Sequence, residues 1–128
     1  MRNIVSGLAT LLIAAAVCLP GPTSAGRVPA QGTAGGSFNG EIMDSQCATM
    51  GSHENMMKAE GAKNAKECTD ACVKTGGKYV LYDAGTKTTY QLDKQDKAKS
   101  FSGQKVTVNG SYDKASQTIH VASIKASS

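Results

Sequence analysis

Three cysteines and one histidine lie within the 26 residues that run from position 47 to position 72. They occur in the order Cys47, His53, Cys68 and Cys72. Thiolate sulfur and imidazole nitrogen are ligands that soft metal ions such as Zn(II) and Cu(I) accept. The pattern therefore predicts a metal site with a Cys3His ligand set, in which Cys68 and Cys72 share one face of a helix.

A disulfide is the alternative use of the same cysteines. Three thiols in an oxidising compartment cannot all pair within one chain, so one would be left over. The expected pair is Cys47 with Cys68 or Cys72, which would tie a helical segment to the end of the first strand and stabilise it by roughly 3 kcal/mol. Pairing Cys68 with Cys72 is disfavoured, because side chains one helical turn apart rarely meet disulfide geometry. The sequence leaves the metal site and the disulfide open.

Enzyme activity is not indicated. A thioredoxin-like centre needs Cys-x-x-Cys beside a βαβ pattern, and covalent haem attachment needs Cys-x-x-Cys-His. Cys68 and Cys72 are instead separated by three residues. We therefore predict no catalytic residue, and expect a binding or structural module.

Other residues near the cysteines bear on metal identity and ligand orientation. Thioethers favour Cu(I), although flexible apolar packing against the barrel is the favoured role for each methionine of this segment. Asp44 follows the first expected strand, where it would cap or turn the chain, or else orient His53 as a hydrogen-bond acceptor. His120 alternates with apolar neighbours in the last expected strand, so it should face solvent. The four methionines that share the cysteine-bearing segment are Met43, Met50, Met56 and Met57.

The first 25 residues have the pattern of a secretory signal peptide. Arg2 precedes an apolar run over 4–19, and small residues precede a cleavage site after Ala25. Cys18 falls inside this segment, and Val17 before it argues against lipidation. The mature protein is expected to be secreted or periplasmic, with no apolar stretch left to span a membrane.

The remaining chain divides into a leader and one domain. Residues 26–37 are small and polar, which is typical of a flexible leader, and residues 38–128 suit one small domain. Without Arg2, 13 basic residues face 10 acidic ones, giving a net charge of +3. The lysines are scattered and Trp is absent, so a nucleic-acid partner is not indicated.

Alternating apolar residues predict a mainly β fold. Strands are expected at 38–43, 78–82, Thr88–Leu92, 105–108 and 118–124, with bends or bulges at Gly40 and Gly110. Helices are expected at 53–60 and from Asn64 to Gly76, and a helical link at 94–101. This order predicts a small five-stranded OB-like Greek-key barrel, with a helical insertion at 45–77 between strands 1 and 2.

Several short motifs resemble those of small secreted bacterial proteins that are uncharacterised and have an OB-like barrel. The likeness covers essentially 38–125. It implies the fold and export, but no activity. The motifs are Gly40-x-Ile42-x-Asp44-Ser45-x-Cys47, then His53, Cys68-Thr69-x-x-Cys72-Val73, and Gly77-Lys78-Tyr79-Val80-Leu81.

Two functions follow from these observations. The first is an exported binding module that holds Zn or Cu through Cys47, His53, Cys68 and Cys72. The second is a disulfide-stapled envelope protein without metal, whose ligand would bind on the barrel face. The tyrosines could line such a face or pack in the core, and they are Tyr79, Tyr82, Tyr90 and Tyr112.

Overall fold

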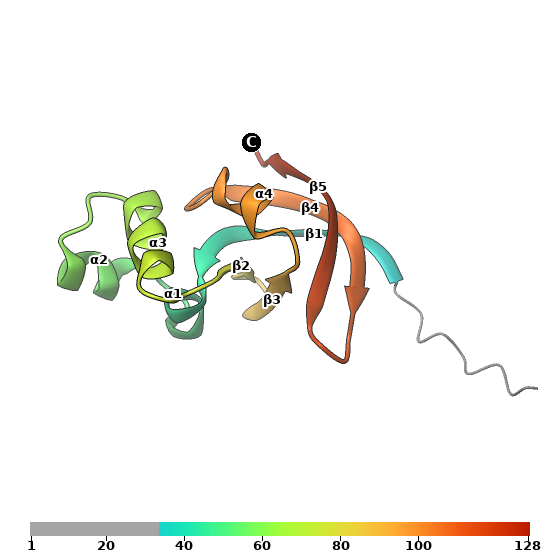
Figure 1. Ribbon diagram of the computed structural model, residues 1–128, viewed down its shortest axis with the longest axis horizontal. Coiled ribbons are helices and arrows are strands. Elements are labelled where there is room, and N and C mark those ends of the chain that lie inside the picture. Colours follow the sequence, from blue (N-terminus) through green and yellow to red (C-terminus); the bar gives the residue numbers. More distant parts are fainter. Residues whose placement is uncertain (1–33) are drawn as a thin grey trace, which may run out of the picture.

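The computed structural model describes residues 34–128, and the expected signal peptide at 1–25 lies outside them. Five strands and four helices form within this range (Figure 1). In chain order they are β1 (Ala34–Asp44), α1 (Ser45–Met50), α2 (Glu54–Glu60), α3 (Ala65–Lys74), β2 (Tyr79–Asp83), β3 (Thr88–Leu92), α4 (Gln95–Lys99), β4 (Lys105–Asp113) and β5 (Thr118–Ala126).

The strands close into a barrel in the order β1-β2-β3-β5-β4. Neighbouring strands are antiparallel except β3 and β5, which pair in parallel through Leu92 and Ile119. The pairing of β4 with β5 shifts register between Asn109 and Gly110, where an irregularity was expected, and the extra residue is Ala122 of β5. The predicted five-stranded OB-like barrel is therefore confirmed, and closure pairs the strand edges that a small open sheet would expose.

Strand β1 pairs with two neighbours along its length. Residues 34–41 pair with β4, and Glu41–Asp44 pair with β2. Gly40 lies where the partner changes, and a Cβ atom there would sit 2.5 Å from the carbonyl oxygen of Tyr82. This close approach of two backbones explains the glycine on the inner side of the strand.

The first strand is longer than the apolar pattern indicated. It begins at Ala34, four residues before Phe38, so residues 34–37 of the expected leader belong to the sheet. Ala34 to Ser37 pair with Tyr112 to Asn109 of β4. Backbone hydrogen bonds to β4 order this segment. Such bonds do not depend on which residues are apolar, so the hydrophobic pattern of the sequence does not reveal them.

The barrel interior is filled by side chains that alternate along the strands. Its fully buried members come from four strands. Helix α4 covers part of this core with Ala98, and Gln95 hydrogen-bonds to the backbone N–H and C=O of Tyr79 at 2.9 Å each. Besides Ala98, the members with no exposed surface are the strand residues Ile42, Leu81, Val106, Val108 and Ile119.

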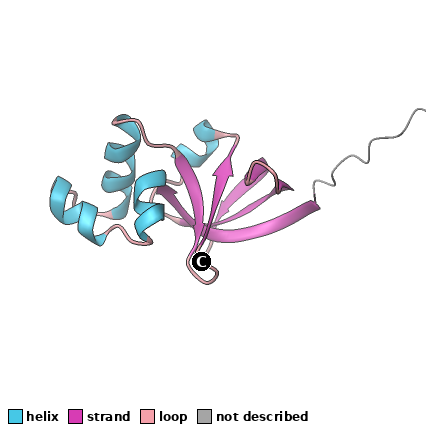
Figure 2. Ribbon diagram, turned by 90° about the horizontal axis from the view of Figure 1, so that it is seen from below, coloured by secondary structure: helices cyan, strands magenta, loops and turns pink. Residues whose placement is uncertain are grey.

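Helices α1, α2 and α3 lie together at one end of the barrel, away from the first residues of β1 (Figures 1 and 2). The side chain of Asn64 accepts a hydrogen bond from the Glu67 N–H at 3.0 Å, as expected for the start of α3. Helix α1 was not anticipated from the sequence.

The turn at Gly103 packs against the first turn of α3 so closely that a Cβ atom would overlap the backbone of Lys66. Gly103 has a φ of +70° and donates its N–H to the Ile42 carbonyl at 2.8 Å.

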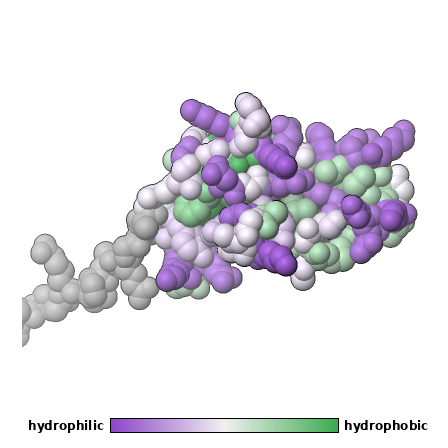
Figure 3. All heavy atoms as spheres, turned by 180° about the vertical axis from the view of Figure 1, so that it is seen from behind, coloured by the Kyte–Doolittle hydropathy of each residue, from purple (hydrophilic) through white to green (hydrophobic). Residues whose placement is uncertain are grey.

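No helix within residues 34–128 is long and apolar enough to cross a membrane. On the face drawn in Figure 3, hydrophilic and hydrophobic side chains are interspersed over both the barrel and the helical end. Isolated apolar side chains of this kind are normal on a protein surface.

Replacing Gly40 by Ala should destabilise the barrel. The new Cβ would clash with the Tyr82 carbonyl, and overpacking of this kind costs ~1–3 kcal/mol in the free energy of unfolding. Gly35→Ala is the matched control in the same strand, because a Cβ there meets nothing within 4 Å. Urea denaturation of both variants tests this, and equal stabilities would show that β1 can move away from β2 at no cost.

Candidate metal centre

The three cysteines of the described chain are buried where the helical insertion meets the barrel. Cys47 and Cys68 have no exposed surface, and Cys72 is 3% exposed. Cys47 lies in α1, while Cys68 and Cys72 lie one turn apart in α3 and are both buried, as predicted from their spacing. They pack in one hydrophobic cluster with Met43 and Val80.

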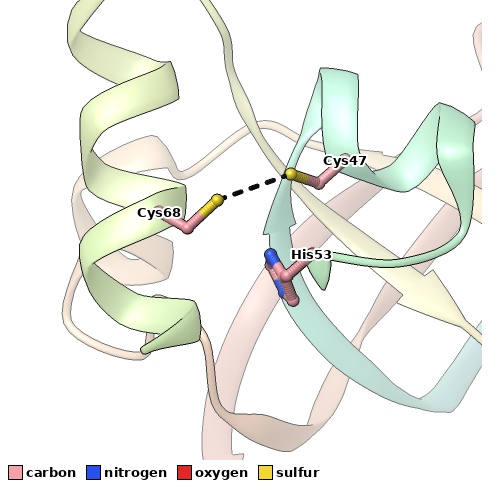
Figure 4. Close-up of side chains that lie close together, drawn as sticks. All are labelled: Cys47, His53 and Cys68. Carbon is pink, nitrogen blue, oxygen red and sulfur yellow. Dashed lines mark hydrogen bonds between the residues drawn. The ribbon is translucent and has the colours of Figure 1, made fainter. Parts of the chain in front are cut away.

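Two thiols and one imidazole converge in this cluster (Figure 4). The sulfur atoms of Cys47 and Cys68 are 3.8 Å apart, and a ring nitrogen of His53 completes a group whose atoms all lie within 4.8 Å of one another. A disulfide would need a sulfur separation of about 2 Å, and all three cysteines of residues 34–128 are unpaired. Two thiolates on one tetrahedral Zn(II), each ~2.3 Å from the ion, lie about 3.8 Å apart.

The imidazole of His53 is oriented by a hydrogen bond from its Nε2 atom to Glu41. It stands just before α2, and its Nε2 atom lies 2.9 Å from Oε1 of Glu41 on β1. The Nδ1 atom is buried and has no hydrogen-bond partner. With Glu41 accepting the Nε2 proton, Nδ1 carries the lone pair, which is the usual carboxylate–histidine arrangement at metal ions.

Asp44 caps helix α1 and does not orient His53. Its Oδ1 atom accepts hydrogen bonds from the N–H groups of Gln46 and Cys47 at 2.9 and 3.0 Å. This confirms the capping role, and Glu41 is the acceptor for His53. Sequence reasoning missed Glu41, because no local pattern reveals which outward-facing strand residue meets the turn before α2.

The four predicted ligands do not form a single group. His53 joins Cys47 and Cys68, whereas Cys72 joins Cys47 and Asp44 in a second group within 4.8 Å. Asp44 has no exposed surface, and its Oδ2 atom lacks a hydrogen-bond partner. The arrangement is therefore two groups of three ligands that share Cys47.

The thiols of Cys47 and Cys72 keep their protons in the metal-free protein at neutral pH. Burial raises the pKa of Cys72 to about 11, and the negative charge of Asp44 adds to the effect. Burial is also the main cause of a raised pKa at Cys47, again with a contribution from Asp44. Such thiols are poor nucleophiles at neutral pH, and a metal ion would have to displace their protons.

A cavity of about 870 Å³ adjoins this cluster at His53. Glu41, Met43, Met57 and Tyr82 are among the residues that line it. His53 therefore borders both the cavity and the thiol group, whereas Cys47 and Cys68 do not line the cavity.

The methionines of this segment behave mainly as packing residues. Met43 is buried in the thiol cluster, and Met56 and Met57 are partly buried against it. Met50 is 47% exposed. The predicted explanation of flexible apolar packing therefore accounts for Met43, Met56 and Met57.

The remaining candidates lie away from the thiols. His120 is exposed, as expected, and its Nδ1 atom is 3.3 Å from Oδ2 of Asp93. Phe38, Tyr90 and Tyr112 pack against one another with tilted or edge-on rings, at centroid separations between 5.3 and 5.9 Å. These two tyrosines contribute to packing along the barrel.

Comparison with protein-family models, with curated proteins and with solved structures returns no match for this chain. The class that fold and site define is an OB-like barrel with a buried thiol–imidazole cluster at the end covered by α1–α3. Because a fold alone does not determine function, what the site does has to be argued from its chemistry.

Cys72 should make the metal-free protein sensitive to high pH. Its pKa is about 11 in the folded chain against 9.0 for a free thiol, so its contribution to stability is complete below pH 9 and is lost between pH 9 and 11. We expect the free energy of unfolding to fall more steeply over this range in the wild type than in Cys72→Ala. Urea denaturation with reductant and chelator measures both slopes, and lysine and tyrosine titration cancels in the difference. Parallel slopes would mean that the Cys72 thiol is not perturbed by the fold.

Proposed function

We propose that this protein is a small binding module that holds a soft metal ion through Cys47, His53 and Cys68. The observation that carries the proposal is the buried group itself, with two unpaired thiols 3.8 Å apart and an imidazole nitrogen within 4.8 Å of both. The unsatisfied Nδ1 atom of His53 is what distinguishes this group from ordinary core packing.

A metal ion would supply what the buried group lacks. Buried polar atoms normally have hydrogen-bond partners, and leaving one without a partner costs ~1–3 kcal/mol. Coordination would use the lone pair on His53 Nδ1 and would replace the protons of Cys47 and Cys68. Glu41 would raise the basicity of His53 and fix its orientation, as carboxylates do behind histidine ligands.

The donor atoms favour Zn(II) over Cu(I). Thiolate, imidazole and a neighbouring carboxylate together suit Zn(II), while Cu(I) prefers sulfur ligands alone. The packing role of Met43, Met56 and Met57 weakens the case for thioether ligands. Three protein ligands would leave a fourth position open, and His53 lines the cavity from which another ligand would reach it.

The signal-like pattern of residues 1–25 supports a location outside the cytoplasm for this binding function. A disulfide between Cys47 and Cys68 is the competing use of the same atoms in that compartment. The proposed role is binding rather than catalysis, since the thiols of Cys47 and Cys72 have raised pKa values and make poor nucleophiles.

Replacing His53 by Ala should weaken metal retention. Removing one nitrogen ligand should lower the affinity for Zn(II) at least tenfold, as measured by competition with a chromogenic chelator. His120→Ala is the matched control, because that histidine is exposed and pairs with Asp93. Equal affinities in the two variants would remove His53 from the site. If the wild type is instead isolated 2 Da lighter than its fully reduced form, with one alkylatable thiol rather than three, the cysteines form a disulfide.

Replacing Glu41 by Gln should act on the metal through His53. The amide keeps the size of the side chain but loses the negative charge, and loss of such an outer carboxylate weakens metal binding by about 10–100-fold. Glu54→Gln, next to His53 in the sequence and also at the cavity, is the control. The same chelator competition measures both, and an unchanged affinity in Glu41→Gln would mean that Glu41 only packs against the imidazole.

A further inference from the structure

The second group of ligands, Asp44, Cys47 and Cys72, has no role in a site built on His53. We propose that the cluster holds two divalent ions of the Zn(II) type, bridged by the thiolate of Cys47. The first ion takes His53 and Cys68, and the second takes Asp44 and Cys72. This inference rests on the proposed function and specifies its stoichiometry.

The geometry separates the two sites around one shared sulfur. His53 belongs only to the first group and Cys72 only to the second, while Cys47 belongs to both. All ligand atoms of each group lie within 4.8 Å of one another, which is close to the spacing around a single ion. A thiolate sulfur has more than one lone pair, so Cys47 can bind an ion on each side.

Asp44 provides independent evidence for the second ion. Its side chain has no exposed surface, and Oδ1 is occupied by two backbone N–H groups at the start of α1. Its Oδ2 atom has no partner, although a carboxylate oxygen of this residue lies within 4.8 Å of the sulfurs of Cys47 and Cys72. A buried carboxylate oxygen without a partner is costly, and a cation at this position would satisfy it.

Charge balance leads to the same stoichiometry. With both ions bound, the thiolates of Cys47, Cys68 and Cys72 and the carboxylate of Asp44 carry four negative charges in a buried cluster. With one divalent ion at the first site, Cys72 keeps its proton, and the charges of Cys47, Cys68 and Asp44 leave one negative charge uncompensated. A second divalent ion displaces the Cys72 proton and neutralises the cluster. Binding both ions releases three thiol protons to solvent, and no electron is transferred.

Native mass spectrometry of the reduced full mature chain, titrated with Zn(II), tests the stoichiometry. We expect two bound ions in the wild type and one in Asp44→Asn. Asparagine is as good a helix cap as aspartate, so its carbonyl oxygen can still accept the N–H groups of Gln46 and Cys47. Asp96→Asn, an exposed change in the first turn of α4, is the control and should bind two ions.

The outcomes are distinguishable. A single ion in the wild type, or two ions in Asp44→Asn, would overturn the two-ion site while leaving the proposed function in place. No bound ion at all would overturn both. If Asp44→Asn does not fold, ¹¹³Cd NMR of the wild-type chain decides instead. Two resonances coupled to each other through one sulfur are expected, and one resonance would overturn the inference.

Discussion

The double pairing of β1 is the constraint on which the rest of the structure depends. This strand closes the barrel by joining β4 along its first part and β2 along its last. The same strand then delivers Glu41, Met43 and Asp44 to the helical end within four consecutive residues. The barrel core and the thiol cluster are thus built on one piece of backbone, and the position of one determines the position of the other.

Much of this architecture was evident from local patterns. Apolar runs and alternation located all five strands, and β3 matched to the residue. Strand β2 reads as a continuous apolar run because it is buried on both faces, with Leu81 in the barrel core and Val80 in the thiol cluster. The capping side chain of Asn64 identified the start of α3 and hence the shared face of Cys68 and Cys72. Helix α1 was missed since it is only six residues long, and its cap, Asp44, was also consistent with a simple turn.

The site was predictable in its ligand types but not in its grouping. Spacing along the chain placed Cys47, His53, Cys68 and Cys72 in one insertion, but spacing carries no information on which ligands meet across elements. Glu41 reaches His53 only because β1 and the turn before α2 meet in space. Asp44 joins the thiols because capping α1 buries its carboxylate beside Cys47.

The close contact between Gly103 and the start of α3 has a consequence for how the candidate ligands are brought together. The turn at Gly103 hydrogen-bonds to β1 and leaves no room for a side chain against the start of α3, so the helix is docked by backbone contact. The position of the α3 thiols is therefore set by backbone contacts in which none of the candidate ligands takes part. For the proposed metal ion, the conformational entropy of gathering ligands from distant parts of the chain would then be lost on folding rather than on binding.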